Sequence, residues 1–442
     1  MSARDLRSLM PMSRRKNPLP DRRSFLKSST ASTAGLLTLP ALSPSALLLG
    51  RDVIRVGLIG CGGRGTGAAV NALRADKGVE LVALADVFPD RLLECLNHLT
   101  TGKGTKDVAA RVRVDESRRY SGFEGGRALI ESDVDVVLLA ETPHFRPVHL
   151  ARAIAAGKHV FAEKPVAVDA PGVRSALQSA ELAKQKGLTL VGGLCWRYDN
   201  EKVATIGEVL NGRIGEIRAM QCTYNTGTLW HRGDNPAWSR MEWQLRNWLY
   251  FAWLSGDHIA EQHIHSLDKM PWAMGGAYPV KCTANGGRQV RTDPMYGNVY
   301  DHFNTTYEWA NGVKAFASCR QMAGCSQDVS DHIFGSKGTC HVFEHRCTGE
   351  DPWEFEGEPN NMYQEEHNRL FRSIRDGKPI NDGDYLAKTT LMSIMGRMAA
   401  YTGQTVTWEQ AMNSQERLGP TEYSWSDIPV DPIPMPGITR LR

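Results

Sequence analysis

The spacing of hydrophobic residues divides most of the chain into two differently patterned parts. Between residues 53 and 195, segments with helical periodicity alternate with short apolar runs, namely VIRVGLIG, VELVALAD, VDVVLLA, HVFAEKP and LTLVGGL. Buried runs of this length, each followed by a helix, are typical of a parallel sheet covered on both faces. From about Arg213, longer alternating runs such as EIRAMQCTYNT predict an antiparallel sheet, and the Asn-Gly of WANGVKAF predicts a hairpin turn within it. We therefore predict an α/β fold: an N-terminal doubly wound domain, then a C-terminal α+β domain with an open, mainly antiparallel sheet.

The first 45 residues follow neither pattern. They contain the basic sequence DRRSFLKSST, with Arg22 and Arg23 adjacent, and then a weakly apolar stretch interrupted by Pro40 and Pro44. This order predicts a twin-arginine signal peptide at 1–45, hence export through the twin-arginine translocase to the periplasm or beyond. The alternatives are a basic disordered tail and an uncleaved anchor. The apolar run is short for a membrane span, and we predict no span in the mature chain.

Composition and charge exclude several classes of function. With 41% hydrophobic and 23% charged residues, the chain is typical of a soluble globular protein with a sizeable core. The formal net charge of +3 comes from the basic leader, so the remainder offers no basic surface for nucleic acid. The nine cysteines include no C-x-x-C pair and make neither a disulfide framework nor a zinc ribbon, so we expect most of them to be buried thiols.

A glycine-rich turn follows the first apolar run. The motif G-x-G-x-x-G is formed by Gly60, Cys61, Gly62, Gly63, Arg64 and Gly65. Gly60 permits a tight turn, Gly62 lets backbone amides approach a pyrophosphate, and Gly65 permits close helix–strand packing. Asp86 ends the second run about 20 residues later, where a carboxylate binds ribose hydroxyls and would repel a 2′-phosphate. The sequence thus predicts a Rossmann domain over 46–195 that binds NAD rather than NADP; a glycine loop without a ligand is the alternative.

Polar groups follow each of the next three apolar runs, at the edge of the sheet where the carboxyl ends of parallel strands meet. Their sequences resemble those of a known protein family. These groups are ETPH at 141–144, EKP at 163–165 and CWR at 195–197. With the glycine motif, the segment TPHFRPVHLARAIAAGKHVFAEKP resembles the glucose–fructose oxidoreductase / inositol dehydrogenase / rhizopine catabolism (Gfo/Idh/MocA) family. The resemblance extends from Val53 to the closing segment GKPINDGDYLAKTTLMSIMGRMAAYTGQTVTWEQAM.

The resemblance implies roles for residues of the first domain. Lys164 would be catalytic, beside the nicotinamide, where it would hydrogen-bond the reacting oxygen and help to pass its proton. Glu163 would touch the nicotinamide ribose. The remaining residues assigned to the cofactor site are Thr142, His144 and His149 along the cofactor's path, Cys61 and Arg64 in the glycine motif, and Arg197 after the last apolar run, LTLVGGL. A solvated lysine at a strand end is the alternative for Lys164.

The family also has a helix with an acidic residue, a histidine four positions later and an aspartate three beyond that. The segment SGDHIAEQHIHSLD offers Glu261, His265 and Asp268. This spacing places all three on one helical face. His265 would remove the hydroxyl proton there, and Asp268 would orient His265 or share the proton. Because the family commonly has Asp where this chain has Glu261, the role of Glu261 is open. The alternatives are a hydrogen-bonded helix face and, together with His258, a divalent-metal site; hydride chemistry needs no metal, and we predict none.

An aromatic and basic stretch between Thr226 and Trp253 suits a carbohydrate cleft. Its candidates for substrate contact are Trp230, His231, Arg232, Trp238, Arg246 and Trp248. Aromatic anchors that fix a long loop on the core are the alternative. We therefore predict that residues 196–442 form a substrate and oligomerisation domain whose last helices pack back on the first domain, and the resemblance suggests a homo-oligomer.

Three functions fit these residues. The first is an NAD-dependent oxidoreductase that oxidises a secondary hydroxyl of a sugar, glycoside or polyol. The second is an NAD-dependent glycosidase that works by transient oxidation at C3 and elimination, as the resemblance allows. The third is a non-catalytic, cofactor-bound sensor. Because free NAD is scarce outside the cytoplasm, export favours a tightly bound dinucleotide.

Overall fold

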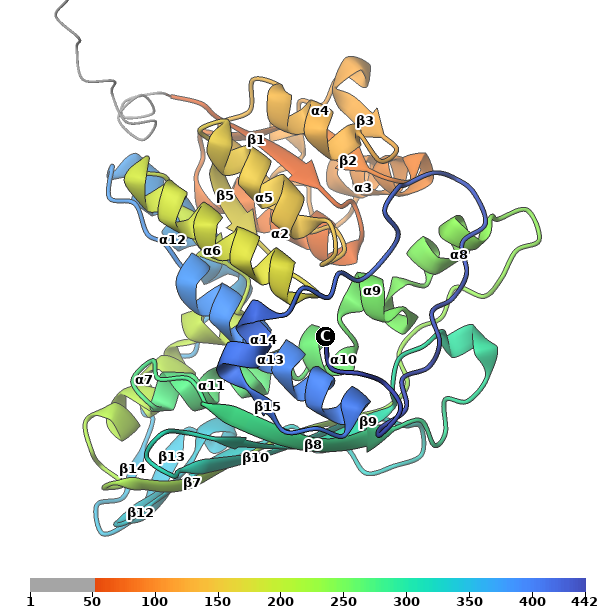
Figure 1. The fold of residues 1–442 in the computed structure, drawn as a ribbon. Helices are drawn as coiled ribbons and strands as arrows, with labels where there is room; N and C mark the ends of the chain where they lie inside the picture. The colour runs from red at the N-terminus through yellow and green to blue at the C-terminus, as the bar shows by residue number, and fades with distance from the viewer. Residues whose placement is uncertain (1–51) are drawn as a thin grey trace, which may run out of the picture. The chain divides into compact units, whose positions relative to one another are not determined.

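The computed structural model describes residues 52–442 (Figure 1), and the predicted signal peptide at 1–45 lies outside the described residues. Within residues 52–442, no helix is long and apolar enough to span a membrane.

The first part of the described chain forms a six-stranded parallel sheet in the order β3-β2-β1-β4-β5-β6. Its strands are β1 (Ile54–Ile59), β2 (Val79–Asp86), β3 (Arg119–Ser121), β4 (Val136–Leu139), β5 (His159–Ala162) and β6 (Leu190–Gly192). Nearly every residue of β1, β2, β4 and β5 is buried, as continuous apolar runs predict for a sheet covered on both faces. The predicted doubly wound sheet is confirmed.

Helices on both faces complete this layer, and two of them come from the far end of the sequence. The local helices are α2 (Gly63–Ala75), α3 (Pro89–Thr101), α4 (Gly125–Glu131), α5 (Arg146–Ala155) and α6 (Ala170–Gln185). The later helices α12 (Met362–Arg375) and α13 (Gly383–Thr402) pack against α2 and α6 (Figure 1). Leu370, Phe371 and Ile374 of α12 join the same hydrophobic cluster as the buried side chains of β1.

The second part forms a nine-stranded sheet in the order β14-β13-β12-β11-β7-β10-β9-β8-β15. Its strands are β7 (Ile217–Thr226), β8 (Lys281–Gly287), β9 (His302–Glu308), β10 (Lys314–Gln321), β11 (Asp331–Gly335), β12 (Gly338–His341), β13 (Arg346–Gly349), β14 (Trp353–Glu354) and β15 (Val406–Thr407). All pairs are antiparallel except β7 with β10. The mainly antiparallel sheet and the β9–β10 hairpin, which turns at Asn311 and Gly312, are as predicted.

Helices cover one face of this sheet. The helices of the second part are α7 (Asn200–Leu210), α8 (Arg240–Arg246), α9 (Ala252–Ser255), α10 (His258–Glu261), α11 (Ile264–Ala273) and α14 (Trp408–Asn413). Of these, α11 lies against β7, while α13 lies against β8 and β9 (Figure 1). Two aromatic side chains of the sheet are exposed, Phe316 of β10 (51%) and Phe334 of β11 (38%). The homo-oligomer that the resemblance suggests stays a prediction.

Candidate active site

The glycine-rich turn joins β1 to α2 and has space only for glycine at two positions. Gly60 has φ +94°, and a Cβ there would lie 2.3 Å from the Glu141 amide nitrogen. A Cβ on Gly65 would lie 1.8 Å from the Gly60 carbonyl oxygen. At Gly62, by contrast, a Cβ would meet no atom within 4 Å, so the backbone there faces open space at the N-terminus of α2. This cradle fits the pyrophosphate of a dinucleotide.

The turn opens onto a cavity of about 550 Å³ that lies at the carboxyl ends of the parallel strands. The cavity extends from Asp86 and Phe88 at the end of β2 to Lys164 after β5 and His265 on α11. Gly60, Gly62, Arg64 and Gly65 line it; Cys61 does not, but its backbone amide donates to Asp86.

The Asp86 carboxylate connects the glycine turn to the end of β2. Its two oxygens accept hydrogen bonds from the backbone amides of Cys61, at 2.7 Å, and Phe88, at 2.9 Å. Burial raises the pKa of Asp86 despite these bonds. The carboxylate thus lies where a Rossmann fold holds the adenosine ribose.

Lys164, Glu261 and His265 converge on the cavity from different elements. Lys164 follows β5, and its ammonium donates to the Glu261 carbonyl oxygen at 2.5 Å and contacts the Glu261 carboxylate at 3.2 Å. Glu261 ends α10, and His265 lies in the first turn of α11. All three line the cavity. They bring a cation, a carboxylate and an imidazole to one place, which is a set of groups suited to proton transfer.

His265 is held in its neutral form. Burial lowers its pKa well below the ordinary value, and the positive charges of Lys164 and Lys269 lower it further. Its Nδ1 is buried without a hydrogen-bond partner among the described residues, and its ring centroid lies 5.0 Å from that of Trp196. The neutral imidazole has a ring nitrogen that can accept a proton, and the same burial and positive charges make it a weak base.

The expected single helical face is wrong, because the helix breaks between Glu261 and His265. α10 ends at Glu261 and α11 begins at Ile264. Asp268 is outside the cavity lining and is 2% exposed. It accepts hydrogen bonds from Arg197, at 2.7 and 3.0 Å, and from Thr389, at 2.8 Å. The predicted pairing of Asp268 with His265 is therefore replaced by an ion pair with Arg197.

Arg197, assigned to the cofactor site from the sequence, also lies outside the cavity lining. Besides its ion pair with Asp268, its guanidinium lies over the rings of Tyr385, at 4.1 Å, and Trp272, at 4.9 Å. These contacts make Arg197 part of the packing between η3 (Cys195–Tyr198), α11 and α13.

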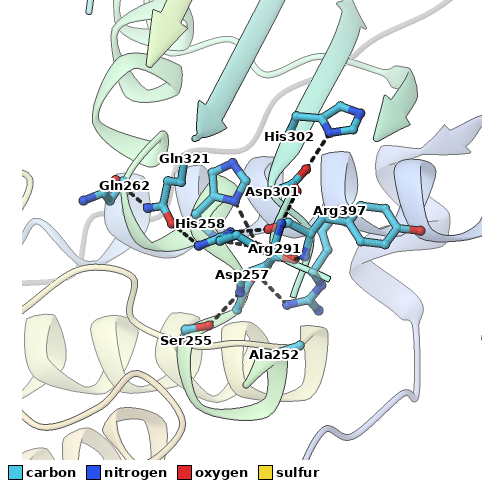
Figure 2. Close-up of polar contacts among 12 residues, drawn as sticks. Ala252, Ser255, Asp257, His258, Gln262, Arg291, Asp301, His302, Gln321 and Arg397 are labelled. Carbon is cyan, nitrogen blue, oxygen red and sulfur yellow. Dashed lines mark hydrogen bonds and ion pairs between the residues drawn. The ribbon is translucent and has the colours of Figure 1, made fainter. Parts of the chain in front are cut away.

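A buried polar network fixes the break between α10 and α11 (Figure 2). Asp257, which has φ +68°, accepts hydrogen bonds from the backbone amide and ring of His258. Gln262, in the break itself, accepts from Gln321 at 2.8 Å, and Gln321 in turn accepts from Arg291 at 2.6 Å. The break thus depends on side chains from β10 and from the loop before β9, which no local pattern indicates.

Arg64, from the glycine motif, lies between two buried carboxyl groups. Its Nε contacts Glu163 at 2.5 Å, and its Nη2 lies 3.6 Å from Glu366 of α12. Burial raises the pKa of Glu366 well above its ordinary value, and neither of its oxygens receives a hydrogen bond from the described residues. Burial alone would also raise the pKa of Glu163, but Arg64 and Lys164 hold it below the ordinary value. The sequence did not indicate Glu366, nor Tyr363 of the same helix, which lines the cavity.

The predicted residues along the cofactor's path separate into two groups. Thr142 and His149 line the cavity, and His149 Nδ1 lies 3.1 Å from the Glu141 carboxylate. His144 lies behind the lining, where its Nε2 is 2.7 Å from the Tyr423 hydroxyl. Burial lowers the pKa of His144 to about 4, so its ring is neutral at neutral pH.

The aromatic and basic stretch contributes four of its six candidates to the cavity. The lining includes Trp230, Arg232, Arg246 and Trp248. His231 instead donates to the Met295 carbonyl, with its Nε2 3.0 Å from that oxygen. Trp238 packs against the Arg246 guanidinium at 5.0 Å.

Within residues 52–442, no group of three or more His, Cys, Asp or Glu side chains is arranged to hold a metal ion.

Two family descriptions match most of the described chain. Residues 54–193 match the oxidoreductase family with an NAD-binding Rossmann fold, and residues 203–341 match the GFO/IDH/MocA C-terminal domain.

Relatives and solved structures are similar over different shares of this chain. An inositol 2-dehydrogenase of Pseudomonas savastanoi pv. phaseolicola is 31% identical over 66% of this chain and 74% of that protein. A glycosyl hydrolase family 109 protein of Shewanella pealeana is 28% identical over 46% of each chain, so this chain matches less than half of that relative. The structure of an aldose-aldose oxidoreductase from Caulobacter crescentus has a TM-score of 0.62 and 22% identity, over 80% of this chain and 99% of that chain. It supports the fold alone.

Proposed function

This chain belongs to the Gfo/Idh/MocA family of NAD-binding oxidoreductases, and we propose that it oxidises a secondary hydroxyl of a sugar, glycoside or polyol. It is a dehydrogenase that acts on CH–OH groups. The observation that carries the proposal is the convergence of Lys164, Glu261 and His265 at one end of the cavity that begins at the glycine turn. Similarity to inositol 2-dehydrogenases supports a polyol or sugar as substrate.

The chain's own groups supply the proton transfers of this reaction. Bound NAD would supply the acceptor for the hydride of the carbinol carbon. His265, neutral and buried, takes the hydroxyl proton. The Lys164 ammonium donates a hydrogen bond to the same oxygen as negative charge develops on it, and the Glu261 carboxylate at 3.2 Å orients that ammonium. Loss of the hydride from the carbinol carbon and of the proton from its oxygen leaves a carbonyl group.

The wall around the substrate end suits a hydroxylated ring. Trp230 and Trp248 offer aromatic faces with ring centroids 6.3 Å apart, and the Arg232 guanidinium lies 4.6 Å from the Trp230 ring. Aromatic faces pack on the apolar side of a sugar ring, while guanidinium groups donate to its hydroxyls.

The test is turnover by the purified full chain on a panel of inositols, aldoses and aryl glycosides, with and without added NAD. We expect a ketone product and reduced nicotinamide with at least one polyol or sugar. Glycoside cleavage without net reduction of NAD would instead support the glycosidase, which the similarity to a glycosyl hydrolase family 109 protein favours. Bound NAD with no turnover on the panel would contradict both the dehydrogenase and the glycosidase activity. It would support the non-catalytic, cofactor-bound sensor.

We further propose that the cofactor is NAD and that it is tightly held. Asp86 at the end of β2 supports NAD, because a carboxylate there would repel a 2′-phosphate. Phe88 and Phe123 line the cavity near Asp86 and are backed by Trp425, whose ring centroid lies 5.7 Å and 4.9 Å from theirs. This aromatic wall would slow escape of the adenosine half. Export, as the leader predicts, would make such retention necessary.

Trp425→Ala is therefore expected to raise the dissociation rate of NADH about fivefold, since removing an aromatic pair costs on the order of 1 kcal/mol. The measurement is the decay of protein-bound NADH fluorescence after dilution into excess NAD. Ile438→Ala is the control, because Ile438 is also in the C-terminal segment but is 71% exposed. Equal dissociation rates for the wild type and Trp425→Ala would contradict the proposed retention.

A further inference from the structure

Two cysteines face each other across the antiparallel strands β12 and β13. Cys340 lies directly opposite Cys347 in the ladder. The Glu350 amide donates to the Lys337 carbonyl at 2.9 Å, so residues 337 and 350 form a hydrogen-bonded pair. Because the two kinds of opposed pair alternate along an antiparallel ladder, Cys340 and Cys347 form a non-hydrogen-bonded pair. The Cα atoms of such a pair are about 4.5 Å apart, which is within the ~4.4–6.8 Å that a disulfide requires.

The two side chains share one buried environment. Cys340 is fully buried and Cys347 is 2% exposed, and both belong to the core cluster under the second sheet. The interaction between the two thiols lowers the pKa of Cys347; burial opposes the change, and the nearby Arg213 guanidinium adds to it. The same interaction and burial raise the pKa of Cys340. Cys347 is therefore the better nucleophile of the two.

Charged groups that act on Cys347 line a polar cavity at the surface. The charged groups that act on the Cys347 thiol include Arg213, Glu208 and Asp351. The same three side chains line a cavity of about 540 Å³. β13 has only the two-residue strand β14 beyond it at the sheet edge, so a small opening of this edge exposes the sulfur.

We propose that Cys340 and Cys347 form a reversible disulfide when the folded protein meets a disulfide oxidant such as oxidised glutathione. The Cys347 thiolate attacks one sulfur of the oxidant, displaces one thiolate and forms a mixed disulfide. The Cys340 thiolate then attacks the Cys347 sulfur and displaces the second thiolate. The cysteine pair loses two protons and two electrons, and the oxidant leaves as two thiols.

The disulfide would close a hairpin that supports the catalytic histidine. The turn between the two strands is the short 3-10 helix Val342–Glu344. Phe343 in this turn packs edge-on against Trp196 at 5.0 Å, and Trp196 lies 5.0 Å from His265. A covalent link at the base of the hairpin restricts the motion of Phe343 and so steadies the ring stack behind His265.

The test uses the full chain equilibrated in glutathione buffers from fully reduced to fully oxidised, quenched with acid, alkylated in urea and digested with trypsin without reductant. Cleavage after Lys337 and Arg346 places the two cysteines in separate peptides. We expect those peptides to be joined in the oxidised samples, about 2 Da lighter than the sum of the free-thiol forms. The oxidised protein should also unfold a few degrees higher than the reduced protein.

Variants separate this bond from unspecific oxidation. In Cys340→Ser, Cys347 should accumulate as the mixed disulfide with glutathione, because its resolving thiol is missing. Cys282, whose buried thiol donates to the Met395 carbonyl at 3.4 Å, should be alkylated as a free thiol in every buffer. If Cys340 and Cys347 are both alkylated as free thiols in oxidised glutathione, the proposal is overturned. These readouts need no substrate, so they are independent of the proposed activity.

Discussion

Replacing Lys164 by methionine is expected to lower kcat about 10²–10⁴-fold, the range that positioned acid–base groups contribute. Methionine keeps much of the length and apolar volume of the side chain but removes the ammonium that contacts both the carbonyl and the carboxylate of Glu261. The developing alkoxide then has no cation beside it. The measurement is steady-state oxidation of whichever substrate the panel identifies, together with the amount of NAD that the variant binds.

A matched control exists in the same domain. Lys158 also donates to two backbone carbonyls, those of Ser132 at 3.0 Å and Val134 at 2.7 Å, but it lies outside the cavity lining. Lys158→Met should therefore leave kcat within a few-fold of the wild type. If Lys164→Met binds NAD normally and also keeps kcat within a few-fold, Lys164 has no catalytic role.

Removing the Asp331 carboxylate is expected to cost about 3–5 kcal/mol of the free energy of unfolding, as breaking a buried ion pair does. Asp331 of β11 and Lys269 of α11 are both fully buried, with 2.6 Å between the carboxylate and the ammonium. Asp331→Ala leaves the ammonium without its counter-ion among apolar and aromatic groups, 3.4 Å from the Trp196 ring centroid. The measurement is urea unfolding of the purified variant and wild type.

Two further variants show whether the lost pairing is the cause. The double variant Lys269→Met with Asp331→Leu removes both charges and should recover most of the lost stability. Asp384→Ala breaks the exposed pair of Asp384 with Lys388, at 2.9 Å on one helix, and should cost less than about 1 kcal/mol. An Asp331→Ala effect as small as that of Asp384→Ala would show that the buried pair contributes little.

The first sheet could be predicted from the sequence because its determinants are local. Each buried strand is a continuous apolar run, and Gly60, Gly65 and Asp86 follow their strands at the spacing that a dinucleotide turn requires. Lys164 and Glu163 were placed correctly at the end of β5 for the same reason.

The second half of the site could not be read in the same way, because distant residues shape it. The spacing of Glu261, His265 and Asp268 is that of one helix, but Gln262 is bound by Gln321 from β10, and the helix breaks there. Asp268 faces Arg197, which lies 71 residues earlier in the chain. Glu366 reaches Arg64 from a helix about 300 residues later, and no periodicity or motif connects positions so far apart.

The packing of α12 on α2 has a consequence for how the molecule assembles. Leu370, Phe371 and Ile374 complete the core beneath β1, but the chain builds the whole of β7 to β14 before it returns to supply them. A fragment limited to residues 52–195 would expose that apolar surface to water. The two sheets therefore cannot be treated as separable folding units, and pairings this remote in sequence predict slow, cooperative folding.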